Sequence, residues 1–161
     1  MTTLAWAERA QVPASMLNPS LIGLLIASAA AGYRKKSARD MPWELIFIVM
    51  PLVLHKQTRQ ELPGAISTHL VTWVGKHPQL CATFPYRAQS LRDPTLEGLR
   101  FALRHEWVQL SGADLTSKVS KFTSADLGDL RELLRKAEFV GRWLSFTPRT
   151  STIYSLLGVT P

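Results

Sequence analysis

A nearly unbroken apolar stretch from Trp43 to Leu54, WELIFIVMPLVL, constrains the fold of this chain more than any other feature. A second apolar run, LIGLLIASAAAGY, precedes it at residues 21–33. A helix that crosses a membrane needs about 20 apolar residues, and both runs are shorter. We therefore expect two buried helices that neighbouring helices surround on all sides. A membrane-associated hairpin of the two runs is the remote alternative.

The length and charge of the chain limit what it can be. Its 161 residues suffice for one domain with a real core, and we expect an N-terminal arm at 1–17 and a single domain at 18–161. Nineteen Lys and Arg against twelve Asp and Glu give a net charge of +7. Such a surplus favours polyanions or an acidic protein partner.

Cysteine content and the amino terminus bear on the cellular compartment. Cys81 is the one cysteine, which excludes an internal disulfide and a cysteine-based zinc site. Glu8 and Arg9 fall where a signal peptide would need apolar residues. We expect a cytoplasmic protein.

Prolines and glycines divide the first third of the chain into helices. Asn18 before Pro19 is typical of a helix start, and Gly32 of a helix end. Residues 34–40, RKKSARD, then form a predicted basic loop. The apolar helix that follows is expected to kink at Pro51, where proline removes a backbone hydrogen-bond donor.

Six further elements are predicted downstream. A short helix ends at Gly75, a longer one covers 79–92 with Pro85 as a break or a new start, and Asp93 before Pro94 opens another. The later elements are a β-hairpin at 107–119, around the turn sequence SGAD, a helix at 123–144 with Thr123 and Asp126 as a capping box, and a terminal helix ended by Gly158. The fold class is mainly α with a hairpin, and a helix followed by a hairpin resembles the end of a winged helix.

The sequence lacks the common motifs for nucleotide binding and metal binding. The chain contains neither G-x-x-x-x-G-K-[ST] nor G-x-G-x-x-G, so it lacks the backbone cradle that binds nucleotide phosphates. Its four histidines do not have metal-ligand spacing, and Cys81 is best interpreted as a small buried hydrophobe. We expect no enzyme activity, no catalytic residues, no cofactor and no metal.

Basic side chains are the best candidates for function. Arginine and lysine can bind phosphates or a partner's carboxylates, although such residues usually lie on solvated helix faces. The candidate contact residues are Arg34, Lys35, Lys36, Arg39, His55, Lys56, Arg59, Arg100, Arg104, Lys118, Lys121, Arg131, Arg135 and Arg142. If the first two helices pack antiparallel, we expect the groups at 34–39 and 55–59 to form one basic surface.

Several segments, in their order, resemble a known family. The segments are NPSLIGLLIASAAAGY, MPWELIFIVMPLVLH, TRQELP, a short Trp-containing helix, RKAEFVGRWL and a terminal LLGVTP, between Asn18 and Pro161. They are similar to the middle components of bacterial three-component ABC systems, in the branch whose ATPase is Rad50-like or SMC-like.

The resemblance implies a non-catalytic adaptor in an anti-phage or anti-plasmid defence system. Its partners would be the Rad50/SMC-like ATPase, a third-component effector and double-stranded DNA, with no membrane. The alternative from another class is a sequence-independent DNA-binding winged-helix protein. In that alternative Arg100 and Arg104 precede the wing, and Lys118 and Lys121 lie on it.

Overall fold

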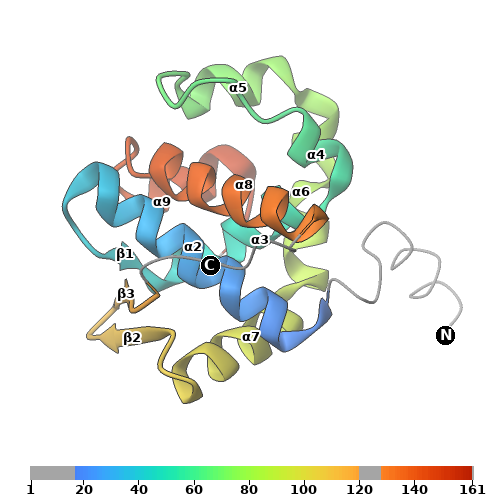
Figure 1. The fold of residues 1–161 in the computed structure, drawn as a ribbon. Helices are drawn as coiled ribbons and strands as arrows, with labels where there is room; N and C mark the ends of the chain where they lie inside the picture. Colours follow the sequence, from blue (N-terminus) through green and yellow to red (C-terminus); the bar gives the residue numbers. More distant parts are fainter. Residues whose placement is uncertain (1–16, 120–127, 161) are drawn as a thin grey trace, which may run out of the picture.

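The computed structural model describes residues 17–119 and 128–160. The described part is mainly helical with a small antiparallel sheet, as the sequence predicts (Figure 1). Its helices are α2 (Pro19–Ser37), the 3-10 turn η2 (Trp43–Leu45), α3 (Ile46–Leu54), α4 (Lys56–Gln60), α5 (Leu70–Lys76), α6 (Pro78–Ser90), α7 (Arg92–Arg104), α8 (Asp129–Leu144) and α9 (Thr150–Leu157). Its strands are β1 (Met41–Pro42), β2 (Val108–Ser111) and β3 (Asp114–Ser117).

Helix α2 forms the centre of the domain, between α7 and α8 (Figure 1). It starts as predicted, because the Asn18 side chain accepts a hydrogen bond from the backbone N–H of Ser20 at 2.8 Å and Pro19 occupies the first turn. It does not end at Gly32 but continues to Ser37, and Ala38 closes it at a φ of 59°. Gly32 is buried inside the helix.

Position 32 requires a glycine because α2 and α8 approach each other closely. A Cβ added to Gly32 would lie 2.2 Å from the backbone oxygen of Glu138. One added to Gly141 on α8 would lie 2.0 Å from the backbone oxygen of Ala29. The two helices therefore touch backbone to backbone, which only small residues allow.

The apolar helix α3 is buried, as predicted, with Ile46, Ile48 and Leu52 fully inaccessible to solvent. Pro51 lies inside the helix, which ends at Leu54, and the backbone of His55 is extended. The kink expected at Pro51 stays a prediction. Within residues 17–119 and 128–160, none of the helices combines the length and the apolar character needed to cross a membrane.

Several predicted boundaries need correction. Helix α6 continues through Pro85 without a break. Helix α7 begins at Arg92, so Asp93 lies in its first turn instead of capping it. The capping pair predicted at the start of α8 lies outside the described residues, and the described helix begins at Asp129. The terminal helix ends at Gly158 with a φ of 71°, as expected.

The predicted hairpin is confirmed. Strands β2 and β3 pair antiparallel with Leu110 opposite Leu115, and Gly112 in the two-residue turn has a φ of 62°. Strand β1, which sequence patterns missed because it has two residues, pairs with β3 and gives the order β1-β3-β2. The resemblance to a winged helix stays a prediction.

The close approach of α2 and α8 predicts the effect of a single methyl group. Gly141→Ala should lower the free energy of unfolding by about 3 kcal/mol, the upper end for overpacked cores, because its Cβ meets rigid backbone. Gly75→Ala in α5 is the matched control, since a Cβ there meets nothing within 4 Å. This control should be neutral or stabilise by up to about 1 kcal/mol. Urea denaturation of the two variants measures both effects, and equal stabilities would contradict the packing argument.

Candidate functional site

Four basic residues gather at the carboxyl end of α2. Arg34, Lys35 and Lys36 belong to the last turn of the helix, not to a loop as predicted, and all three are exposed. Cations at this position offset the negative end of the helix dipole. Arg39 follows in the connection to β1 and is also exposed.

Contacts with α8 enlarge this group. Lys35 Nζ lies 3.7 Å from Glu138 Oε1, and Arg142 Nε lies 3.8 Å from the same oxygen. Lys36 Nζ lies 5.2 Å from the centre of the Phe146 ring, which is 49% exposed. We name the following group, in which Arg142 is half-buried and the other residues are exposed, the α2–α8 basic surface: Arg34, Lys35, Lys36, Arg39, Arg142 and Phe146.

Not every charge on this surface is available to a partner. Arg34 forms an ion pair with Asp40, and Glu138 compensates part of the charge of Lys35 and Arg142. Lys36 and Arg39 form no ion pair with any described residue. They are therefore the cations that an acidic partner would meet with the least competition.

Two other predicted contact residues of α8, Arg131 and Arg135, lie nearer its amino terminus. Both are exposed, and neither has an ion-pair partner among residues 17–119 and 128–160. Together with Arg142 they form the predicted stripe on α8, of which Arg142 also belongs to the α2–α8 basic surface.

His55, Lys56 and Arg59 do not join that surface. They follow α3, whereas the group at 34–39 precedes it, and the length of η2 and α3 separates the two groups (Figure 1). A helix that runs back along α2 carries its own carboxyl end away from the connection, which is why the expected single surface does not form. Lys56 is exposed, but Arg59 is half-buried and donates to the backbone oxygen of Val53 at 2.7 Å.

His55 is a structural residue and not an exposed contact, because it is only 8% exposed. Its Nδ1 accepts from the backbone N–H of Thr58 at 3.3 Å and lies 2.7 Å from the Thr58 hydroxyl oxygen. That oxygen accepts in turn from Arg87 Nη2 at 3.0 Å. Burial, followed by the charges of Arg87 and Arg59, lowers the pKa of His55 to about 4. His55 is therefore neutral at pH 7 and caps α4.

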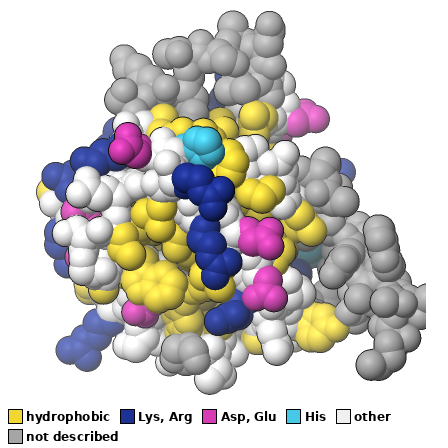
Figure 2. Space-filling model, turned by 90° about the horizontal axis from the view of Figure 1, so that it is seen from below, with side chains coloured by type: hydrophobic (Ala, Val, Ile, Leu, Met, Phe, Trp, Pro, Cys, Tyr) yellow, Lys and Arg dark blue, Asp and Glu magenta, His cyan; other side chains and the backbone are white. Residues whose placement is uncertain are grey.

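A second basic group surrounds the end of α7. Arg100 and Arg104 are exposed and form no ion pair with the described residues. Lys118 is joined to the same region, since its backbone N–H donates to Trp107 O at 2.8 Å. Figure 2 views the molecule from the side on which α7 lies and shows Lys and Arg side chains in a row, with Asp and Glu beside it. Lys121, the other predicted wing residue, lies outside the described residues.

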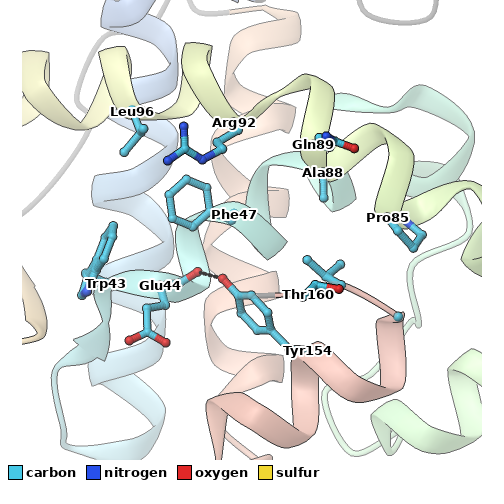
Figure 3. A pocket seen from close by; sticks show the side chains of 12 residues that line it. Trp43, Glu44, Phe47, Pro85, Ala88, Gln89, Arg92, Leu96, Tyr154 and Thr160 are labelled. Atoms are coloured by element: carbon cyan, nitrogen blue, oxygen red, sulfur yellow. Dashed lines mark hydrogen bonds between the residues drawn. The ribbon is translucent and has the colours of Figure 1, made fainter.

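Sequence reasoning missed an apolar cavity of about 660 Å³, which we name the α3–α9 cavity (Figure 3). It lies where η2, α3, α6, α7, α9 and the tail after α9 converge. Its lining consists of Trp43, Glu44, Phe47, Pro85, Ala88, Gln89, Arg92, Leu96, Tyr154, Gly158, Val159 and Thr160. The spacing of Trp43 and Phe47 was the available signal, because two aromatic residues four positions apart share one helix face.

Two observations bear on nucleophilic and metal chemistry in the described residues. Burial raises the pKa of the Cys81 thiol, which disfavours the nucleophilic thiolate. Among the residues that the structure describes, no three His, Cys, Asp or Glu side chains are grouped as a metal site would require.

Comparison with protein families identifies the chain. A family model described as ABC-three component (ABC-3C) system Middle Component 3 matches residues 6–161. The chain therefore belongs to this family of middle components. Neither the curated proteins nor the solved structures gave a match.

The buried histidine predicts how stability changes with pH. The native pKa of His55 lies below its ordinary value of 6.5, so between pH 6.5 and 4 the unfolded chain binds a proton that the native chain does not. The contribution of His55 is complete above pH 6.5, and about 3 kcal/mol is lost as the pH falls to 4. His55→Asn, which keeps a capping side chain, should remove this part of the pH dependence.

Chemical denaturation at several pH values measures the difference. His69→Asn is the control, because His69 is exposed and its side chain makes no capping bond. This variant should retain the wild-type profile. An unchanged slope in the His55 variant would show that His55 does not titrate in this range.

Proposed function

We propose that this middle component is a non-catalytic adaptor that links a Rad50/SMC-like ATPase to an effector protein in an anti-phage or anti-plasmid defence system of the cytoplasm. The observation that carries the proposal is membership of the middle-component family over residues 6–161. A three-component system needs contacts between its components, and this chain supplies exposed basic surfaces that suit such contacts.

The ATPase binds the α2–α8 basic surface. Lys36 and Arg39 are exposed cations without ion-pair partners among the described residues, so their charge is available to acidic groups. Phe146 adds an exposed aromatic ring beside Lys36. An aromatic side chain next to cations is the composition found where proteins bind one another most strongly.

Reversing the two available cations tests this docking. Lys36→Glu with Arg39→Glu should weaken the affinity for the co-encoded ATPase at least tenfold, because close like charges repel at an interface. The melting temperature should change little, since exposed charges contribute little to folding. Co-purification and a binding titration at fixed salt measure the effect.

Lys56→Glu with Lys76→Glu is the matched control, because it changes the net charge equally at exposed positions on α4 and α5. Its affinity for the ATPase should remain at the wild-type value. If only the control loses binding, the docking surface lies at α4 and α5. If both double variants bind normally, the docking surface lies elsewhere, and the stripe Arg131, Arg135 and Arg142 becomes the next candidate.

A second candidate function is sequence-independent DNA binding. Arg100, Arg104 and Lys118 support it, because they are exposed at the junction of α7 with the hairpin and have no ion-pair partners among the described residues. The order of α7, β2 and β3, with β1 beside β3, suits a winged helix. DNA bound there would be contacted through its phosphates.

Salt dependence tests the DNA proposal. The isolated chain should bind duplex DNA with an affinity that falls steeply as salt rises, because each neutralised phosphate releases counterions. Arg100→Glu with Arg104→Glu should lower the affinity at least tenfold and reduce the slope by about 2. Fluorescence anisotropy with two unrelated duplexes measures both. An affinity that does not change with salt concentration, or a double variant with the wild-type slope, would contradict the DNA-binding proposal.

A further inference from the structure

We propose that the α3–α9 cavity binds a short segment of another protein of the same three-component system, through one large apolar side chain of that segment flanked by a basic residue. This inference rests on the proposed adaptor function and adds a second, apolar contact to the basic docking surface. Its occupant is a protein segment and not a small metabolite.

The interior of the cavity is suited to an apolar side chain. Trp43 and Phe47 contact each other edge to face, with their ring centres 5.6 Å apart, and Leu96 lies beside them on α7. Most of the surface that lines the cavity is apolar. An apolar side chain placed there gains by leaving water.

The charged lining residues lie at the margin. Figure 3 shows Arg92 reaching over Phe47 from α7, while the Glu44 carboxylate lies on the opposite side and points away from Arg92. Glu44 is exposed and pairs with no cation among the described residues, whereas the Arg92 side chain is 63% exposed and lies 3.3 Å from Asp93. The carboxylate of Glu44 is thus the more available charge, and it selects a basic residue beside the apolar one.

The cavity walls are fixed before any partner binds. The Tyr154 hydroxyl donates to the backbone oxygen of Glu44 at 2.6 Å, which joins α9 to η2. Burial, followed by the charge of Glu44, raises the pKa of Tyr154 to about 12, so the donor keeps its proton at pH 7. Gly158 turns the chain at a φ of 71° and brings Val159 and Thr160 against the opening. A preformed site of this size needs little ordering when it binds.

Peptides test the proposal directly. Fluorescent 15-residue peptides that tile the co-encoded ATPase and effector are titrated with the full chain, and one containing a large apolar residue next to Lys or Arg should bind. Glu44→Lys should weaken that peptide about tenfold, and exchanging the basic residue of the peptide for Glu should restore binding to this variant. Because the backbone and not the carboxylate of Glu44 accepts from Tyr154, the substitution leaves that bond in place.

Glu97→Lys is the control, since Glu97 is exposed on α7, outside the lining, and undergoes the same change of charge. It should bind the peptide as the wild type does. Leu96→Trp reduces the cavity without changing charge and should abolish binding while the circular dichroism spectrum stays helical. A peptide unaffected by both Glu44→Lys and Leu96→Trp would overturn the proposal.

Failure of this inference can be distinguished from failure of the adaptor function. If the full-length ATPase or effector binds but no tiled peptide does, the cavity is not their docking site and the adaptor function stands. If neither full-length protein binds, the adaptor function fails and this inference fails with it. A small molecule that co-purifies with the chain and is displaced by Leu96→Trp would also overturn the inference.

Discussion

The backbone contact between α2 and α8 is the constraint on which the rest of the fold depends. Gly32 and Gly141 allow the two helices to approach until backbone meets backbone. Gly98 allows α7 to pack closely on α2, because a Cβ there would lie 2.3 Å from the side chain of Ile22. With α2 held on both sides, α3 can be apolar over its whole surface because all of its residues except Phe47 are buried. The contact also assembles the proposed docking surface, since it brings Glu138 and Arg142 beside the end of α2.

A buried arginine plays a comparable part around α4 and α6. Arg87 is only 6% exposed and has no acidic partner among the described residues. It donates instead to Thr58 Oγ1 and to the backbone oxygen of Leu80, and its Nε remains without a partner. A buried charge is costly unless neutral groups solvate it, so the short helix α4 is tied closely to α6.

Local signals predicted the elements, and contacts between distant segments explain the errors. The cap at Asn18 and the turn glycine at Gly112 act within a few residues, so the helix start and the hairpin were predictable. Gly32 has the appearance of a helix end, yet its partner is Glu138, which no local pattern reveals. The sequence identifies the basic residues but not how they group in space, because Lys35 and Arg142 come together at Glu138 only in the folded chain. The α3–α9 cavity was missed for the same reason.

The crossing of α2 and α8 also affects how the protein folds during its synthesis on the ribosome. Helix α2 is the first α-helix of the described residues, and α8 follows all the others except α9, so the crossing cannot form until α8 has been synthesised. Until then α3, which is apolar on all sides, has only part of its final cover. Contacts between such distant segments slow folding, and apolar surface that stays exposed meanwhile favours aggregation.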